Sequence, residues 1–227
     1  MNILGQQKSS FIDYPNKIST VYFTGGCNFK CPYCHNKDLV NSIGTKFSED
    51  EIFSFLLKRK KFIDAVCISG GEPTLQKDLY KFISKLKSEG FFVKLDTNGY
   101  SPDILESLIK DEMLDYIAMD IKGPLYAYEK IAGVKIDVNL IKKSIDIIKG
   151  SNIDYEFRTT ICRELITIKD IVDIANMLKG SKSYFLQNFR DGDTVLYGKN
   201  CLTPYDKEEL EELEAILKDY FELFRIK

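Results

Sequence analysis

The residues best suited to chemistry are three cysteines within eight positions, Cys27, Cys31 and Cys34. Thiolates at such spacing are typical ligands of zinc or of an iron–sulfur cluster. A structural zinc site closes with four Cys or His ligands, usually as two close pairs far apart in the sequence. This chain has no second pair, and its one histidine, His35, directly follows Cys34. Adjacent side chains rarely close one tetrahedron, so zinc is the weaker interpretation.

An iron–sulfur cluster accounts better for three thiolates. A cluster of four irons normally takes four of them, so three leave one iron without a protein ligand. Catalytic metal sites keep such an open position for a substrate or cosubstrate. The remaining cysteines, Cys67, Cys162 and Cys201, are poorly spaced for a second cluster, and we expect them to be packing residues because free cysteines are usually buried. Two interpretations remain open for His35: it contacts the metal ligands from the next layer of residues, or it only packs within the loop.

The elements that position these residues follow from hydrophobic periodicity, in which short β-rich runs alternate with longer amphipathic ones. Strands are expected at 17–25, 64–70, 91–99, 115–121, 153–161 and 182–189. Helices are expected at 48–61, 77–90, 102–110, 137–149, 167–179 and, as a C-terminal helix, about 204–224. Ser48 with Glu51 three positions later forms a capping box, which marks the start of the first of these helices.

This alternation predicts an α/β fold with parallel strands and right-handed crossovers. Six units fit a partial, open (β/α)6 TIM-like barrel better than a closed eight-fold one. No linker or compositional step divides the chain, so a single domain is expected over 1–227, with a cysteine loop at about 25–36.

The unusual sequence motifs all fall near strand ends. "GGCNFKCPYC" follows the first strand, "SGGEPT" the second, "DTNG" the third and "MDIKGP" the fourth, whereas "FRTT" lies within the fifth and "LQNF" ends the sixth. Ligands of parallel βα folds collect at the C-terminal ends of the strands. The motifs are therefore expected to meet at one mouth.

Composition excludes several classes of function. A net charge of -2 and a pI near 5.6 argue against a nucleic-acid partner, which would need a basic surface. The chain has no secretory pattern and no apolar run of the roughly 18 residues that a membrane span needs, so a cytoplasmic protein without a membrane partner is expected. No Ser/His/Asp constellation, Walker loop or paired-carboxylate motif is present.

The C-x3-C-x2-C loop after a first strand, with Tyr33 before the last cysteine and "GGEPT" after the second strand, resembles the radical S-adenosylmethionine (radical SAM) superfamily. The resemblance covers almost the whole chain. It implies that Cys27, Cys31 and Cys34 carry a [4Fe-4S] cluster whose fourth iron is chelated by S-adenosylmethionine (SAM). It also implies that one-electron reduction cleaves SAM to methionine and a 5'-deoxyadenosyl radical.

The same resemblance assigns residues to the parts of SAM. Gly70 and Gly71 let the backbone approach a ligand, so that Glu72 can present either its carboxylate or its backbone to the methionine amino group. Tyr33 is implied to contact the adenine, largely through its backbone. Four residues resemble those that bind the ribose and carboxylate in glycyl-radical enzyme activases: Asp96, Asn98, Lys122 and Arg158. Three match the positions that hold a monovalent cation in those relatives: Asp96, Thr97 and Asp120.

The string "SFIDYPNKISTVYFTGGCNFKCPYCHN" resembles the start of the activases of anaerobic ribonucleotide reductase and other glycyl-radical enzymes. Asn16 stands where that pattern has glycine, which bears only on the turn geometry. The resemblance implies a radical that abstracts hydrogen from a glycine of a partner enzyme, with ribonucleotide reductase the first candidate, and an electron donor of the flavodoxin or ferredoxin type. Two alternatives remain: a radical SAM enzyme acting on a small molecule, such as a 7-carboxy-7-deazaguanine synthase-like enzyme, and a zinc-stabilised binding protein.

Overall fold

One sheet of eight strands, in the order of the sequence, forms the centre of the computed structural model, which describes residues 1–227. The first two strands are antiparallel, and every later neighbour is parallel. The strands are β1 (Ile3–Ser10), β2 (Ser19–Thr24), β3 (Ala65–Gly70), β4 (Phe92–Thr97), β5 (Tyr116–Asp120), β6 (Asp154–Ile161), β7 (Ser183–Asn188) and β8 (Leu223–Ile226).

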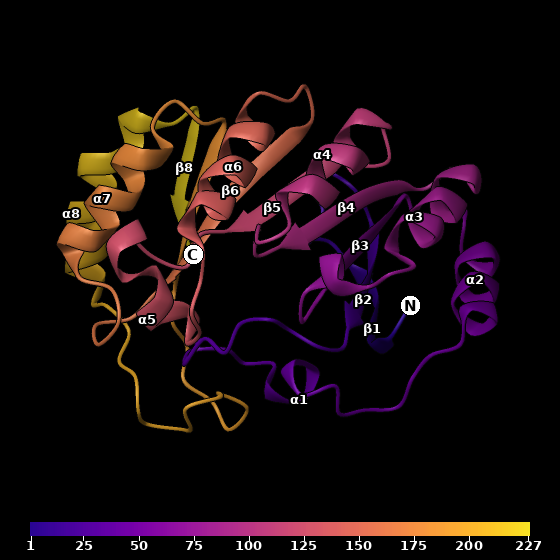
Figure 1. Ribbon diagram of the computed structural model, residues 1–227, viewed down its shortest axis with the longest axis horizontal. Coiled ribbons are helices and arrows are strands. Elements are labelled where there is room, and N and C mark those ends of the chain that lie inside the picture. The colour runs from indigo at the N-terminus through magenta and orange to yellow at the C-terminus, as the bar shows by residue number, and fades with distance from the viewer.

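Helices connect the parallel strands and lie along the outside of the curved sheet (Figure 1). They are α1 (Lys37–Val40), α2 (Glu49–Lys58), α3 (Leu79–Ser88), α4 (Pro102–Lys110), α5 (Tyr128–Ala132), α6 (Val138–Lys149), α7 (Ile168–Leu178) and α8 (Lys207–Leu217). Helix α2 begins at the predicted capping box, in which Ser48 accepts a hydrogen bond from the Glu51 amide. None of these helices is both long and apolar enough to cross a bilayer.

The structure confirms the partial barrel and the six predicted strands, and it adds a strand at each end of the chain. Strand β1, "ILGQQKSS", is an edge strand with a mostly polar sequence, and only its first and last residues are buried. It therefore lacks the apolar alternation by which a strand is recognised. Its place in the sheet comes from pairing with β2, and the local sequence pattern of β1 does not predict that pairing.

The predicted C-terminal helix is too long. Helix α8 ends at Leu217, a short 3-10 turn follows at Lys218–Tyr220, and β8 then joins the sheet beside β7. Aromatic rings hold this end in place, since the Tyr184 ring lies 5.0 Å from that of Phe221 and 5.8 Å from that of Phe224. Because the aromatic partner lies on β7, tertiary contact overrides the helical pattern of the segment.

The turn between β1 and β2 closes the N-terminal end of the barrel. Tyr14 in this turn is 5% exposed, and its ring lies 5.7 Å from the ring of Tyr116, the first residue of β5. Asn16 has a φ of 60°, in the left-handed region that glycine and asparagine tolerate best. Asparagine thus supports the turn that glycine makes in the resembling sequences.

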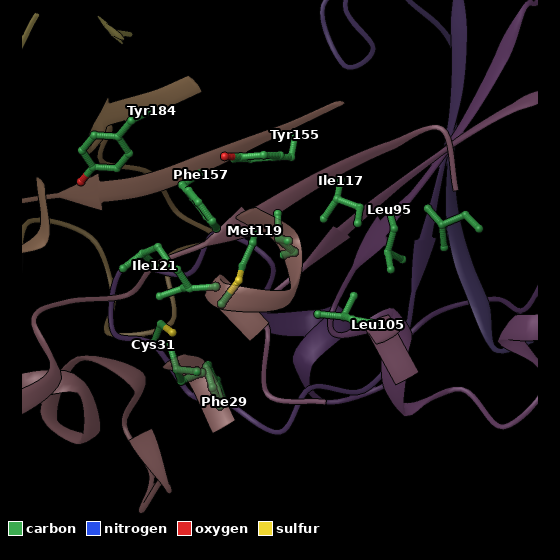
Figure 2. Close-up of a cluster of buried hydrophobic side chains, with 14 of the residues drawn as sticks. Phe29, Cys31, Leu95, Leu105, Ile117, Met119, Ile121, Tyr155, Phe157 and Tyr184 are labelled. Atoms are coloured by element: carbon green, nitrogen blue, oxygen red, sulfur yellow. The ribbon is translucent and has the colours of Figure 1, made fainter. Parts of the chain in front are cut away.

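Most of the hydrophobic core lies between the sheet and the helices, where the outer faces of the strands meet the helical apolar stripes. Figure 2 shows Leu95, Ile117 and Phe157 from neighbouring strands within this core. The opposite, inward faces of the same strands carry charged residues. The sheet therefore separates an apolar layer from a polar barrel interior.

Candidate active site

A cavity of about 200 Å³ opens at the C-terminal ends of β2 to β6. The structure brings every predicted site residue to its wall. These residues are Cys27, Cys31, Tyr33, Cys34, Gly70, Gly71, Glu72, Asp96, Thr97, Asn98, Asp120, Lys122 and Arg158. Strand ends up to 131 positions apart in the sequence thus meet at one mouth, as the motif positions predict.

The cysteine loop is fixed to the protein core by its aromatic residues. Phe29 and Tyr33 are 2% and 5% exposed and belong to the main core. Figure 2 shows Phe29 and Cys31 of this loop within the same buried cluster as Ile121. Anchoring of alternate loop residues leaves the thiols of the loop on the cavity wall.

The three thiols fit a multi-iron cluster better than a single metal ion. All three cysteines are free and line the same cavity. No group of three His, Cys, Asp or Glu side chains converges closely enough to hold one ion. Thiols that share a cavity without converging on one point suit a cluster in which each thiolate binds a different iron.

Burial and hydrogen bonds act in opposite directions on these thiols. Burial raises the pKa of Cys27 to about 11 and also raises the pKa of Cys31. The Phe29 amide opposes the rise at Cys27, because it donates a hydrogen bond to Cys27 Sγ at 3.4 Å. The Asn36 amide donates to Cys34 Sγ at the same distance. Binding of a metal group must therefore displace thiol protons, and two amides already point at the sulfurs that would carry the charge.

The long connection between β7 and α8 covers part of the cysteine loop, which sequence reasoning missed. The Leu196 amide donates to the Cys34 carbonyl at 2.8 Å, and the Tyr197 amide donates to the Pro32 carbonyl at 3.1 Å. Figure 1 shows this orange connection and the indigo-to-purple loop along the same edge of the molecule. The two loops share backbone hydrogen bonds, and such contacts carry no signature in side-chain type.

Gly70 and Gly71 allow the turn after β3 to pack on the end of β2. Gly70 has a φ of 114°, and a Cβ at Gly71 would lie 2.1 Å from the Gly26 carbonyl oxygen. No larger residue fits there. Close approach to neighbouring backbone thus requires both glycines, in addition to any approach to a ligand.

The Glu72 carboxylate is buried and already bonded to the protein. Its Oε1 accepts hydrogen bonds from Thr97 Oγ1 at 2.8 Å and from Thr74 Oγ1 at 2.6 Å, and its Oε2 accepts one from the Asn98 amide at 2.7 Å. Burial raises the pKa of this carboxyl, against the effect of those bonds. Of the two predicted contacts with a ligand, the geometry favours the backbone, because the side chain ties the "GGEP" turn to the "DTNG" turn.

A network of charged side chains lies in the barrel interior beneath the cavity. Asp120 Oδ1 accepts from Arg158 Nε at 2.8 Å, and Asp120 Oδ2 lies 3.1 Å from Lys122 Nζ. Arg158 also reaches Asp96 Oδ2, at 3.4 Å. The register of the sheet places Asp120 directly beside Arg158 on neighbouring strands, so the pair forms without a change in backbone path.

Two members of this network were not predicted. Lys94 is 2% exposed, and its Nζ lies 3.0 Å from Asp96 Oδ1 and 3.7 Å from Glu156 Oε1. Ala118, on the strand between them, is small enough to let side chains of β4 and β6 meet across β5. A signal was present in the sequence, since Lys94 and Glu156 each stand two positions before a predicted site residue and so share its face of the strand.

The network favours the charged forms of Asp96, Asp120 and Lys94. Burial opposes the charge on Asp120, but Arg158 and Lys122 outweigh it and lower the pKa of that carboxyl to about 2. The pKa of Asp96 is also lowered, because Arg158 and Lys94 outweigh its burial. Burial likewise opposes the charge on Lys94, yet its carboxylate neighbours raise its pKa.

The remaining cysteines divide into two kinds. Cys67 and Cys162 are fully buried, as expected of packing residues. Cys201 is exposed, so the expectation of burial is wrong for this residue. It lies in the loop after β7, where Val195 and Leu202 are the residues that enter the core while the Cys201 thiol stays at the surface.

A shallow groove continues the cavity toward the end of β7. His35 and Thr160 line both hollows, and Gln187, Asn188 and Arg190 line only the groove, whose volume is about 270 Å³. The His35 ring lies 5.6 Å from the ring of Phe189, so packing is part of its role. The lining of the groove therefore includes amide and guanidinium side chains.

Comparison with known proteins agrees with this geometry. The sequence pattern of the radical SAM superfamily matches residues 21–178. A protein of Methanocaldococcus jannaschii, named as a glycyl-radical enzyme activating enzyme, is 40% identical over 221 residues that cover 94% of this chain and 90% of the relative. The pyruvate formate-lyase-activating enzyme of Clostridium pasteurianum is 36% identical over 122 residues, or 51% of this chain and 50% of that enzyme.

Solved structures share the fold at low sequence identity. Streptococcus suis SuiB bound to S-adenosylmethionine superposes with a TM-score of 0.67 at 16% identity, over 91% of this chain. The matched part is 49% of SuiB, so this chain spans about half its length. The likeness shows a shared fold.

Proposed function

Because this chain belongs to the radical SAM superfamily, we propose that it activates a glycyl-radical enzyme by abstracting hydrogen from a glycine of that partner. The superfamily implies a [4Fe-4S] cluster and SAM. The proposal about the partner rests on the long match to a relative named as a glycyl-radical enzyme activating enzyme. The lead-in string "DYPNK" and the "CHN" after the last cysteine favour the same subgroup.

Cys27, Cys31 and Cys34 would hold the cluster in this proposal, and the loop would supply three protein ligands to it. When bound, the cluster supplies the electron that splits SAM into methionine and a 5'-deoxyadenosyl radical. The chain itself positions the cosubstrate and excludes water, since radical abstraction needs no acid–base pair. Its three thiols on one cavity wall are the observation that carries the proposal.

The remaining cavity residues orient SAM. The backbone of Gly70, Gly71 and Glu72 faces the methionine amino group, because the Glu72 carboxylate is bonded to other residues. In this proposal the ribose and carboxylate of SAM are bound by four charged and polar side chains, those of Asp96, Asn98, Lys122 and Arg158. Tyr33, whose hydroxyl is buried without a hydrogen-bond partner, borders the space proposed for the adenine.

The groove at His35, Thr160 and Gln187 is the proposed entry of the partner glycine. A glycine must reach the centre of the cavity on an extended segment, and polar side chains along the groove can hydrogen-bond its backbone. Anaerobic ribonucleotide reductase is the first candidate partner. A flavodoxin or ferredoxin-type protein is the proposed electron donor.

The test is anaerobic reconstitution with iron and sulfide, followed by dithionite, SAM and a panel of glycyl-radical enzymes that includes ribonucleotide reductase and pyruvate formate-lyase. We expect about four irons per chain, 5'-deoxyadenosine, and a glycyl electron-spin signal on one partner. Cys31→Ser should lose the iron and the product. Cys201→Ser, which alters an exposed thiol outside the cluster loop, is the matched control and should keep both.

Two outcomes would redirect the proposal. If 5'-deoxyadenosine forms but every partner stays without a radical, and a ring-contracted deazaguanine product appears instead, the enzyme acts on a small molecule. If the purified protein holds zinc and no iron, the zinc-stabilised binding protein is correct.

A further inference from the structure

The carboxylates expected to hold a monovalent cation already have cationic partners within the chain. Asp120 bonds to Arg158 through Oδ1 and to Lys122 through Oδ2, at 2.8 and 3.1 Å. Asp96 Oδ2 accepts from Ser69 Oγ at 3.0 Å and lies 3.4 Å from Arg158. Three of the four carboxylate oxygens are thus satisfied without any added ion.

The third expected ligand of the cation is also committed. The Thr97 hydroxyl donates to Glu72 Oε1 at 2.8 Å and accepts from the Gly99 amide at 3.1 Å. Successive side chains of a strand point to opposite faces, so Thr97 lies on the other face of β4 from Asp96. The hydroxyl is therefore directed away from the space between Asp96 and Asp120.

The fourth oxygen, Asp96 Oδ1, faces Lys94. No well-aligned hydrogen bond reaches this buried atom, but Lys94 Nζ lies 3.0 Å away. Neutralisation of charge depends on distance rather than on donor angle, so the pair is a strong ion pair in this buried setting. A metal ion bonded to the same oxygen would stand within a few ångströms of the ammonium and be repelled by it.

We propose that the Lys94 ammonium is the resident cation of this site and takes the place of a free monovalent metal ion. Lys94, Lys122 and Arg158 balance three carboxylates, those of Asp96, Asp120 and Glu156. A further cation would leave a buried excess of positive charge, which is costly. Lys94 acts here as a positioning residue, because it holds Asp96 and, through the shared Glu156, Arg158.

The proposal deepens the proposed function, since Asp96 and Arg158 belong to its SAM site. Its first test does not need SAM. The thermal midpoint of the reconstituted protein is measured in potassium, sodium and choline chloride at constant ionic strength. A cation that binds only the folded protein raises this midpoint as its concentration rises. We expect the same midpoint in all three salts.

Variants of Lys94 extend the test. Lys94→Met leaves the carboxylates of Asp96, Asp120 and Glu156 with only two cations, so its midpoint should fall by roughly 6–20 °C in choline chloride. Potassium or sodium should restore part of that loss and should tighten SAM binding in the same variant. Lys94→Arg keeps the charge and should respond to no salt. Lys87→Met removes a lysine from a half-buried ion pair outside the cavity and is the matched control.

Two results would overturn the inference. One is a wild-type protein that potassium or sodium stabilises above choline. The other is a folded Lys94→Met variant whose thermal midpoint is the same in potassium, sodium and choline chloride. Should that variant not fold, the wild-type and Lys94→Arg midpoints decide. Loss of SAM cleavage with salt-independent midpoints would count against the proposed function alone.

Discussion

Glu72 and the cysteines meet different physical demands at the scale of single residues. The thiols lie on the cavity wall, with backbone amides directed at two of them. The Glu72 carboxylate has its bonds already, with Thr74, Thr97 and Asn98. A residue that lines a cavity can therefore stabilise the fold instead of binding a ligand. Its hydrogen bonds show which of these two roles it has.

Glu72→Gln tests this distinction. The amide keeps the shape but loses the charge and offers hydrogens to neighbours that are themselves donors, so the free energy of unfolding should fall by about 1–3 kcal/mol. Urea unfolding of the protein without cluster or SAM measures it. Glu89→Gln, beside Lys60 on the surface, should change stability by less than about 0.5 kcal/mol. Unchanged stability of Glu72→Gln together with lost SAM binding would instead place the carboxylate on the ligand.

At the scale of elements, the edge strands and the β1–β2 turn are the parts of the fold that do not follow the strand–helix repeat. The central strands follow one another with helices between them, and their apolar periodicity suffices to find them. The edge strands β1 and β8 depend on partners, because pairing with β2 and β7 compensates for weak local signals. The turn from β1 to β2 covers the N-terminal end of the barrel, where the Tyr14 ring packs against the Tyr116 ring.

Asn16 makes that turn testable at the element scale. Its φ of 60° suits glycine, so Asn16→Gly should leave the free energy of unfolding nearly unchanged. Asn16→Ala places a Cβ in the left-handed region without the asparagine amide, and should destabilise the protein by about 1 kcal/mol. Urea unfolding compares the two variants. Equal losses in both would mean that the asparagine side chain, rather than the backbone angle, supports the turn.

The buried charge network belongs to the whole molecule, because it joins β4, β5 and β6 across the barrel interior. Its charges compensate one another at neutral pH. Protonation of any carboxylate in it leaves a buried cation without its partner, and the cost falls on the whole sheet. Strong acid should therefore destabilise the sheet through Asp96 and Asp120, whose pKa values the network lowers.

Asp120 sets the sign of that effect. Its pKa lies near 2 in the folded protein, below its ordinary value of 3.8, so the folded state binds this proton less readily than the unfolded state. The stability it contributes is present above about pH 4 and is lost as the pH falls toward 2. The side chain is 32% exposed, and solvent screening limits the contribution to roughly 1–2 kcal/mol.

Urea unfolding at a series of pH values checks this expectation. The difference in stability between the wild type and Asp120→Asn should shrink as the pH falls from about 4 to 2. Asp154→Asn removes an exposed partner of Lys182 and serves as the control, with little change at any pH. A constant difference across the series would show that Asp120 has an ordinary pKa.

The sequence by itself determined the strand–helix alternation and the placing of the motifs at strand ends. Both are local properties, because periodicity and turn residues are read over a few neighbouring positions. They were enough to predict the partial barrel and to name thirteen residues that share one cavity. They also led to the resemblance that the comparisons confirm.

Only the tertiary structure decided which side chains satisfy one another. Asp96 and Arg158 are 62 positions apart and meet because the sheet places β4 and β6 on either side of β5. Lys94 and Glu156 enter the site by the same register, and the loop after β7 reaches the cysteine loop by folding back over it. Pair energies depend on distance, and distances between remote residues are set by strand register, which the local pattern of a sequence does not contain.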